Sequence, residues 1–546
     1  MKIQYVKLWI DNFLRLKYFG PEFKLVQPLS AGNFLLSEGG VSMNVSNIIE
    51  RHVAENPEKT AIIFGEHRIS YGELNRLINR LAGGLLKMGY AQGDVVSLFL
   101  PSLPELIIGY LGTVRAGLTV NVVNAMLKEQ EVAYILKDCS TKGLIVDEER
   151  LPIVEAIQVE VESLSDIIVL GNSGSNAYPT FESLLENGTD SSKSVEVKDN
   201  DLCHLLYTSG TTGWPKGVMA THRNVWHNAT NFGRIHFDSE DTIMVATPIF
   251  HCWGLVNGTF GMLSRGGTVI TVERFYPTQT IDDIERFKPT IFQGVPPMFN
   301  LLLRHPDLPS QDISSVVFCL SAATKMPENL IRQVEERIKW RYAEAWGLTE
   351  VSCVGTTAPY TETRIGSCGK GMDDAEIKVV NEDGNSLQPG QQGELCIRGT
   401  CVTNGYLNKP DATKAAFDSE GWFHSGDIAY IDDDGFAYIV DRKKDMINVG
   451  GEKVFPSEVE DMLLTHQKIK DLVIVGIPDE LKGEAPKAFI QLKEDERATE
   501  AEIREYCKTK MAPYKVPVAV EFIEEVPRSA SGKALRRMLR DKEWGK

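Results

Sequence analysis

The sequence lacks any apolar run of the kind that crosses a membrane. No stretch reaches the ~18 uninterrupted apolar residues of a membrane-spanning helix, and the nearest, residues 95–114, contains Pro101, Pro104 and Glu105. The N-terminus also lacks the apolar core of a signal peptide, because polar residues such as Asp11 interrupt it. We therefore expect a cytoplasmic protein. The sequence leaves open a peripheral membrane contact through a short N-terminal amphipathic helix, and also a homodimer.

Paired cysteines and an excess of positive charge are both absent. Nine cysteines are scattered without a C-x-x-C pair. This pattern is typical of reduced thiols and not of a disulfide framework or a zinc site. Lys and Arg number 58 against 75 Asp and Glu, which gives a formal net charge of −17. An acidic surface of that size argues against a nucleic-acid-binding protein, although local clusters of cations can still bind anionic small molecules.

Strand and helix patterns alternate along most of the chain. Continuous apolar runs such as residues 95–100 and 202–206 fit buried parallel strands, and amphipathic segments such as residues 71–86 fit helices between them. This alternation predicts an α/β fold with βαβ-type sheets. From about residue 365, short strands with turn signals predict a β-rich subdomain. The last hundred residues predict a small α+β domain.

The composition suggests three segments. We predict a large domain over residues 43–440 and a small C-terminal domain over residues 441–546, with the boundary at the charge cluster 441–445. Residues 1–42 precede a conventional domain start at Met43 and are expected to form a poorly ordered extension. Low-complexity tracts and internal repeats are lacking.

A hydroxyl- and glycine-rich loop lies at residues 207–217, with the sequence Tyr-Thr-Ser-Gly-Thr-Thr-Gly-Trp-Pro-Lys-Gly. It is predicted to connect a strand at residues 202–206 to a helix at residues 221–232. Glycines let the backbone approach an anion, and N–H groups and hydroxyls can then surround phosphate oxygens while Lys216 supplies a cation. No Gly-Lys-Ser or Gly-Lys-Thr closes the loop, which disfavours a P-loop kinase or GTPase.

Four further motifs follow the loop in order. They are Trp-Gly-Leu-Thr-Glu at 346–350, Trp-Phe-His-Ser-Gly-Asp at 422–427, Asp-Arg-Lys-Lys at 441–444 and Pro-Arg-Ser-Ala-Ser-Gly-Lys at 527–533. With them, the chain from about Met43 resembles the adenylate-forming superfamily of acyl-CoA synthetases, peptide-synthetase adenylation domains and beetle luciferases. The resemblance implies that a carboxylate attacks the α-phosphate of ATP to give an acyl-adenylate and pyrophosphate. A thiol, usually that of CoA, then displaces AMP.

The resemblance implies a site for the ATP phosphates and for Mg²⁺. Glu350 would hold the metal with help from the Thr208 hydroxyl, since Mg²⁺ favours a carboxylate with water and phosphate oxygens. The loop would hold the β- and γ-phosphates through Thr208, Ser209, Gly210, Thr211, Thr212, Gly213 and Lys216.

The other motifs are implied to hold the rest of the nucleotide. Trp346, where the family usually has tyrosine, would stack on adenine. Thr349 would reach the AMP phosphate, and Asp427 and Arg442 would bind the ribose. Lys533 would bridge the substrate carboxylate and the α-phosphate, offsetting charge that develops in the transition state.

The resemblance also implies that the small domain is mobile and rotates between the half-reactions about a hinge at Lys444. Rotation would withdraw Lys533 and bring residues 450–453 toward a CoA channel. Gly450, Gly451, Lys443 and Lys453 are the corresponding candidates for CoA binding.

The acid substrate is the least determined part of the prediction. The segment around His251 and Trp253, together with Ala323, resembles the family's acyl pocket, and its surroundings are mostly apolar. His251 is expected in the pocket wall and not as a general base, since a carboxylic acid is already ionised at pH 7. We expect a medium- or long-chain fatty acid. An aryl acid, a separate carrier protein as acceptor, a luciferase-like oxygenase and an inactive acyl-binding protein remain the alternatives.

Overall fold

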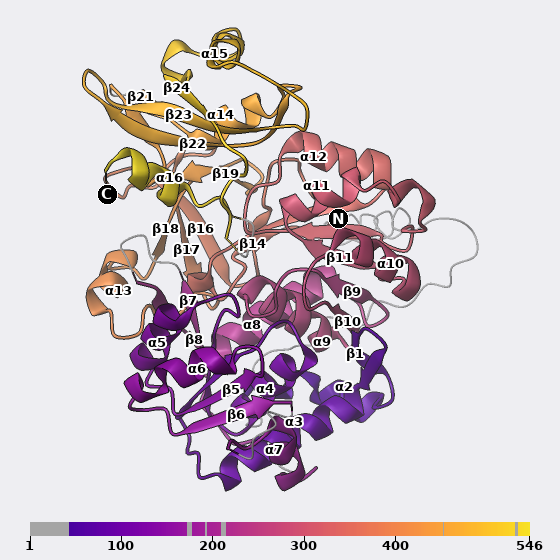
Figure 1. The fold of residues 1–546 in the computed structure, drawn as a ribbon. Coiled ribbons are helices and arrows are strands. Elements are labelled where there is room, and N and C mark those ends of the chain that lie inside the picture. Colours follow the sequence, from indigo (N-terminus) through magenta and orange to yellow (C-terminus); the bar gives the residue numbers. More distant parts are fainter. Residues whose placement is uncertain are drawn as a thin grey trace, which may run out of the picture. The chain divides into compact units, whose positions relative to one another are not determined.

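The computed structural model describes residues 43–171, 177–191, 194–208, 214–450, 452–529 and 533–545. Residues 42–546 form one compact unit, whose elements are labelled in Figure 1. The predicted extension 1–42, the loop residues Ser209, Gly210, Thr211, Thr212 and Gly213, and also Gly451 lie outside the described residues. Among the described residues, no helix combines the length and the hydrophobicity needed to span a membrane.

A first, mainly parallel sheet begins the large N-terminal domain. Its strand order is β6–β5–β3–β4–β7–β8, and β8 runs antiparallel to β7 whereas the other neighbours are parallel. The strands are β3 (Val95–Phe99), β4 (Thr119–Val122), β5 (Gly143–Asp147), β6 (Asp166–Leu170), β7 (Leu202–Thr208) and β8 (Lys216–Thr221). Its connecting helices are α4 (Pro104–Arg115), α5 (Glu129–Asp138), α6 (Leu151–Ile157) and α7 (Phe181–Asn187). The predicted α/β fold is thereby confirmed.

A second sheet has the order β15–β14–β13–β12–β11–β9–β10–β1–β2. The strands from β13 to β1 are parallel, and antiparallel strands flank them. The strands are β1 (Thr60–Phe64), β2 (His67–Ser70), β9 (Thr242–Val245), β10 (Thr268–Thr271), β11 (Ile291–Gly294), β12 (Phe318–Ser321), β13 (Arg341–Trp346), β14 (Thr356–Thr357) and β15 (Lys370–Gly371).

Helices cover both faces of these sheets. One core joins α3 (Tyr71–Lys87), α4, α8 (His222–His236), η3 (Trp253–Phe260) and α9 (Gly261–Arg265) to strands of both sheets. Separate cores lie on the outer faces. Helices α5 and α6 cover the first sheet, and α10 (Pro277–Phe287), α11 (Pro296–Arg304) and α12 (Glu328–Gln333) cover the second, as Figure 1 shows. Ser70 caps α3, because its Oγ accepts a hydrogen bond of 3.2 Å from the Glu73 amide.

The structure corrects the prediction around the glycine-rich loop. The loop joins two strands of an antiparallel hairpin, since β7 pairs with β8 from Leu202↔Thr221 to Thr208↔Lys216, and α8 starts only after β8. Helix α8 therefore does not begin at the end of the loop. Residues 216–221 do not show the apolar alternation of a strand, and pairing with distant residues stabilises β8. Met219 N–H donates to the Gly405 carbonyl at 3.0 Å, and Leu407 N–H donates to the Gly217 carbonyl at 2.8 Å.

The β-rich subdomain is an antiparallel sheet of β16 (Ala375–Val380), β17 (Gly393–Gly399), β18 (Phe423–Ile431) and β19 (Ala437–Arg442), with α13 (Pro410–Ala416) in the β17–β18 connection. The following strands belong to another sheet, which forms the small C-terminal domain. They are β20 (Ile447–Val449), β21 (Glu452–Val454), β22 (Ile469–Asp479), β23 (Gly483–Leu492) and β24 (Ala519–Phe522). The helices of this domain are α14 (Pro456–Leu463), α15 (Glu500–Lys508) and α16 (Arg536–Glu543).

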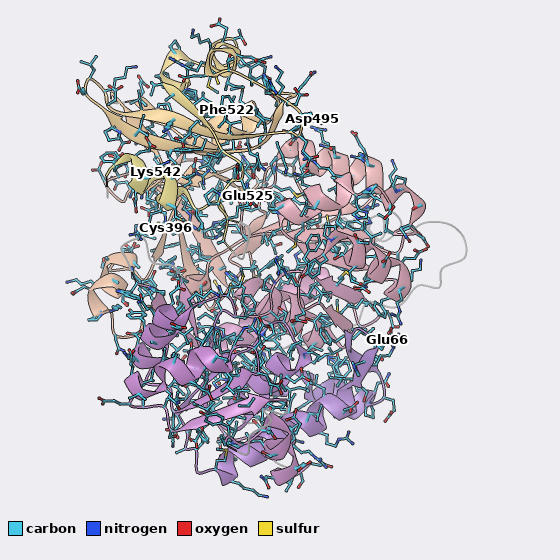
Figure 2. The ribbon with its side chains drawn as sticks, in the orientation of Figure 1. Glu66, Cys396, Asp495, Phe522, Glu525 and Lys542 are labelled. Carbon is cyan, nitrogen blue, oxygen red and sulfur yellow. The ribbon has the colours of Figure 1, made fainter. Side chains whose placement is uncertain are left out.

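Ion pairs fix α16 to the sheet of the small domain. Lys487 on β23 contacts Glu521 and Glu543 at 2.8 Å each, and Lys542 contacts Glu521 at 3.4 Å. Figure 2 labels Lys542 on α16 and Phe522 at the end of β24. Helix α16 begins shortly after Lys533, so these contacts limit where Lys533 can lie.

Candidate functional site

The hairpin β7–β8 brings Thr208 and Lys216 together at the two ends of the glycine-rich loop. The two residues are register partners in the antiparallel pair. Trp214 stacks on Tyr134 of α5, with ring centroids 4.8 Å apart. The ends of the loop are therefore fixed by the sheet and by an aromatic contact, as a loop that binds phosphate oxygens requires.

Tyr406 contacts both charged residues that we expect to meet the ATP phosphates and the metal. Its hydroxyl donates a hydrogen bond of 2.8 Å to Glu350 Oε1. The Lys216 Nζ lies 4.8 Å from the centroid of its ring. Burial and the Glu350 carboxylate raise the pKa of Tyr406, so its hydroxyl is a donor at neutral pH. Tyr406 was not predicted from the sequence, because both of its partners in the site lie far from it along the chain.

Thr349 and Glu350 lie in a single helical turn, η6 (Thr349–Val351), just after β13. The Thr403 amide and hydroxyl both donate to the Glu350 backbone carbonyl at 3.0 Å. Among the described residues, Glu350 Oε2 makes no hydrogen bond, and no cluster of three His, Cys, Asp or Glu side chains could hold a metal ion alone. One free carboxylate oxygen fits Mg²⁺, which is usually bound by one or two carboxylates, water and phosphate.

Trp346, Asp427 and Arg442 form a connected group. Trp346 Nε1 donates to Asp427 Oδ2 at 2.7 Å, and Arg442 Nε contacts Asp427 Oδ1 at 2.5 Å. Asp427 and Arg442 are register partners on β18 and β19, whereas Trp346 comes from the end of β13. The structure thus brings together the three residues predicted for adenine and ribose, and their contacts with a nucleotide stay a prediction.

Lys533 of the small domain is half-buried near residues of the large domain. Burial lowers the pKa of Lys533, the Arg442 guanidinium lowers it further, and Asp427, Cys252 and Glu350 oppose both effects. The backbone of Ser529 donates to the Lys533 carbonyl at 2.8 Å, which fixes the base of the motif loop. The ammonium therefore lies near the residues expected to bind nucleotide and metal, although they are distant in sequence.

The residues predicted for the hinge and for CoA binding contact other side chains and backbone groups of this chain. Burial lowers the pKa of Lys444, and the Arg540 guanidinium of α16 donates to its backbone carbonyl at 3.3 Å. Lys443 contacts Glu394 at 2.9 Å, and Lys453 contacts Glu382 at 2.7 Å. The two lysines are thus paired with carboxylates of the β-rich subdomain in this structure, and Gly450 takes φ of 63° in the turn between β20 and β21. Their roles toward CoA stay predictions.

His251, Trp253 and Ala323, the residues predicted for the substrate pocket, line one small cavity together, and its role as that pocket stays a prediction. The cavity has a volume of about 10 Å³, enough for roughly one water molecule. Trp253 is held by a hydrogen bond of 3.4 Å from its Nε1 to the Gly294 carbonyl and by an edge contact with Phe232. The remaining walls are Thr247, Pro248, Val295 and Met298. Cys252 points elsewhere, because its sulfur lies 4.0 Å from Thr349 Oγ1.

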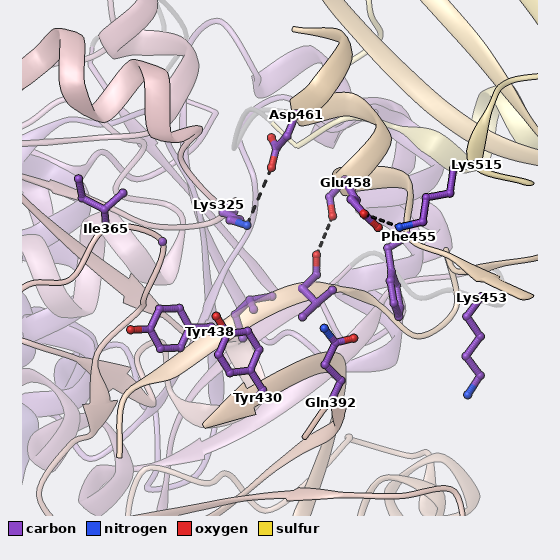
Figure 3. A pocket seen from close by; sticks show the side chains of 14 residues that line it. Lys325, Ile365, Gln392, Tyr430, Tyr438, Lys453, Phe455, Glu458, Asp461 and Lys515 are labelled. Atoms are coloured by element: carbon purple, nitrogen blue, oxygen red, sulfur yellow. Dashed lines mark hydrogen bonds and ion pairs between the residues drawn. The ribbon is translucent and has the colours of Figure 1, made fainter. Parts of the chain in front are cut away.

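A larger cavity of about 520 Å³ lies between the β-rich subdomain and the small domain (Figure 3). The stacked rings of Tyr430 and Tyr438 form one wall, with centroids 4.7 Å apart. Lys325 of the large domain reaches Asp461 of α14 across it, with 3.9 Å between Nζ and Oδ2. The residues predicted for nucleotide do not line this cavity.

The chain is similar to known proteins over nearly its whole described length. A family model described as AMP-binding enzyme matches residues 49–407, and one described as AMP-binding enzyme C-terminal domain matches residues 458–533. The chain is 32% identical over 536 residues to a putative acyl-CoA synthetase, YngI, of Bacillus subtilis (strain 168), with 92% of this chain and 97% of that protein covered. It is 32% identical over 532 residues to a long-chain-fatty-acid–CoA ligase of the same organism, with 91% and 94% covered.

The chain is also similar to a solved structure over most of its length. The chain resembles the anthranilate CoA ligase AuaEII in complex with anthranoyl-AMP, with a TM-score of 0.87 and 28% sequence identity. The similarity covers 92% of this chain and 98% of that protein.

Proposed function

Because this chain belongs to the adenylate-forming superfamily of AMP-binding enzymes and is a CoA ligase, we propose that it joins a medium- or long-chain fatty acid to CoA. ATP and CoA are its co-substrates, and the reaction passes through an acyl-adenylate. The position of the half-buried Lys533 near Asp427, Arg442 and Glu350 supports this mechanism most directly. An anion attacks a polyanion in the first half-reaction, so the site has to neutralise charge more than it has to transfer protons.

Each charged residue has a distinct role in the proposed adenylation. The Lys533 ammonium offsets charge at the α-phosphate and the attacking carboxylate. Lys216, together with the donors of the glycine-rich loop, stabilises the pyrophosphate that leaves, and Thr349 binds the AMP phosphate. Asp427 accepts hydrogen bonds from the ribose hydroxyls, and Arg442 donates to the same sugar. Mg²⁺, when bound by Glu350 and Thr208, would neutralise phosphate charge.

Thioester formation requires the small domain to turn, and we propose Lys444 as the hinge. The proposed boundary at residues 441–445 agrees with the end of β19 at Arg442 and the start of another sheet at Ile447. Lys443, Gly450, Gly451 and Lys453 remain the candidates for CoA. Rotation would have to break the pairs of Lys443 and Lys453 with Glu394 and Glu382 before either lysine could meet a CoA phosphate.

The nature of the acyl pocket supports a fatty acid. Pro248, Trp253, Val295 and Met298 present apolar surface around the cavity, and no arginine or lysine lines it among the described residues. A second carboxylate on the substrate would therefore find no arginine or lysine partner there. The cavity is too small for an acyl chain, so Trp253 or the flexible Met298 side chain has to move when the acid binds.

Two alternatives remain for the same chemistry. An aryl acid is favoured by the similarity to an anthranilate CoA ligase, and a separate carrier protein could replace CoA as the acceptor. A panel of fatty and aryl acids, incubated with ATP, Mg²⁺ and either CoA or a carrier protein, distinguishes them through AMP release and thioester yield. Strict dependence on aryl acids or on the carrier would overturn the proposed substrate. Release of AMP without dependence on any acid would overturn the enzyme class.

A further inference from the structure

Tyr406 is held rigidly beside the base of the glycine-rich loop. It forms an antiparallel bridge with Val218, and the neighbouring residues Gly405 and Leu407 pair with β8. Its own N–H donates to Thr413 Oγ1 at 2.9 Å. The Tyr406 backbone is thus an extension of the hairpin that carries Lys216, although the two residues are distant in sequence.

The side chain of Tyr406 contacts two opposite charges through two different parts. The hydroxyl donates to Glu350 Oε1 at 2.8 Å, and the ring lies under the Lys216 ammonium at 4.8 Å. An aromatic face attracts a cation, and a hydroxyl is a good donor to a carboxylate. Among the described residues, neither Glu350 nor Lys216 makes an ion pair within 4.0 Å. Tyr406 therefore fixes both charged groups without neutralising either of them.

We infer that Tyr406 is a positioning residue that sets the separation between Lys216 and Glu350 for the Mg²⁺-bound polyphosphate of ATP. The inference rests on the proposed roles of these two residues. An aromatic ring with a hydroxyl suits both contacts. Phenylalanine would keep the support under Lys216 and lose the hydrogen bond to Glu350, whereas leucine would lose both. The two variants therefore distinguish the contact with Glu350, the proposed metal ligand, from the contact with Lys216, the proposed phosphate ligand.

The test measures ATP binding to the full chain by calorimetry at a series of Mg²⁺ concentrations, in the absence of acid and CoA. Tyr406→Phe is expected to raise the Mg²⁺ concentration at half-maximal binding about tenfold, as is typical when a partner of a metal-binding carboxylate is removed. At saturating Mg²⁺ its affinity for ATP should stay near that of the wild type. Tyr406→Leu should weaken ATP binding a further twofold to fivefold even at saturating Mg²⁺.

Two further variants make the outcome decisive. Tyr90→Phe removes a tyrosine–carboxylate hydrogen bond of 3.0 Å, to Asp166, far from the predicted nucleotide residues, and should leave the Mg²⁺ midpoint unchanged. Glu350→Gln tests the proposed function itself. If Glu350→Gln shifts the midpoint and Tyr406→Phe does not, the positioning role of Tyr406 is wrong. If Glu350→Gln has no effect, the proposed metal ligand is wrong. If Tyr406→Phe and Tyr90→Phe have the same Mg²⁺ midpoint for ATP binding, the inference is likewise overturned.

Discussion

The indole Nε1 of Trp346 donates a hydrogen bond of 2.7 Å to Oδ2 of Asp427, while Arg442 holds the other carboxylate oxygen. Both Asp427 oxygens thus have a fixed donor, and each keeps a lone pair for another. Trp346 is buried, so its N–H would lack a partner without Asp427. The hydrogen bond connects the end of β13 to β18, two segments that are distant in sequence and belong to different sheets.

Trp346→Phe should raise KM for ATP, because the Asp427 carboxylate loses a hydrogen bond that orients it. The ring remains for stacking, but the carboxylate loses one of its two donors, and we expect KM for ATP to rise about tenfold with a smaller change in kcat. Steady-state kinetics of AMP release measure both constants. Trp544→Phe is the matched control, because it removes an indole hydrogen bond of 2.9 Å to the Gly476 carbonyl in the small domain. An unchanged KM in Trp346→Phe would contradict this role of Trp346.

Lys533→Ala should separate the two half-reactions. Loss of the ammonium is expected to slow adenylation by a factor of at least about 100, because one preorganised electrostatic contact to a transition state is worth that much. Thioester formation from supplied acyl-adenylate and CoA should remain within a few-fold of the wild type. Rapid-quench assays measure each half-reaction separately. Equal loss of both would refute the assignment of Lys533 to the first one.

The adenylation rate should also depend on pH through Lys533. Burial and the Arg442 guanidinium lower the pKa of Lys533 below its ordinary value of 10.5, and only the charged form can offset negative charge. We therefore expect the adenylation rate to fall on the alkaline side at a pH below 10.5. Lys533→Arg should be slower but lose this alkaline decline, since arginine stays protonated. If the adenylation rate declines with the same pH midpoint in the wild type and in Lys533→Arg, a group other than Lys533 titrates.

Glu344 should make the folded state less stable as the pH rises from about 4.5 to 7. It is fully buried on β13 near Tyr342, whose hydroxyl donates to it at 2.6 Å, and burial raises the pKa of Glu344 to about 7. The folded chain then binds more protons than the unfolded chain between about pH 4.5 and 7, so stability falls as pH rises through this window. The total loss is at most about 3 kcal/mol. Above pH 7 the loss is complete.

Glu344→Gln removes this titration and serves as its test. Its thermal midpoint should exceed that of the wild type at pH 8 and approach the wild-type value at pH 5, where Glu344 is mostly protonated. Differential scanning calorimetry at both values of pH measures the difference. Glu525→Gln, at an exposed position labelled in Figure 2, provides a control for adding an amide elsewhere. A constant offset between Glu344→Gln and wild type at both pH values would contradict the prediction.

Trp253→Ala should let the enzyme accept fatty acids with longer acyl chains. The indole forms a wall of a cavity with room for about one water molecule, and its removal would open space toward Phe232. We expect kcat/KM to rise for longer fatty acids relative to shorter ones by about tenfold, measured as AMP release over an acyl-chain series. Val295→Ala, at another wall of the same cavity, should produce a smaller shift. An unchanged order of preference would mean that Trp253 does not limit the chain.

The sequence alone predicted the α/β class well, because apolar runs and helical periodicity are local patterns. It failed at β8, where residues 216–221 form a strand only because β7 and residues 404–407 pair with them on both edges. Helix α7 (Phe181–Asn187), with Thr180 as its cap, lies in a segment for which no element was predicted from the sequence. Strand pairings of this kind depend on residues that a local pattern does not include, whereas the cap of α7 is a local Thr180–Ser183 contact that the sequence pattern could have shown.

The same distinction, between local patterns and contacts of distant residues, applies to the candidate site. The sequence by itself determined where the charged side chains of the motifs stand, such as Lys216, Glu350 and Asp427, and from them it predicts the sites for phosphate, metal and ribose. Only the tertiary structure decided how these charges are held. Tyr406 lies between Lys216 and Glu350, and Trp346 holds Asp427, through contacts between segments that are far apart in the sequence. Hydrogen bonds and cation–π contacts act over a few ångströms of space, and the folding of the chain alone brings such distant residues within that range.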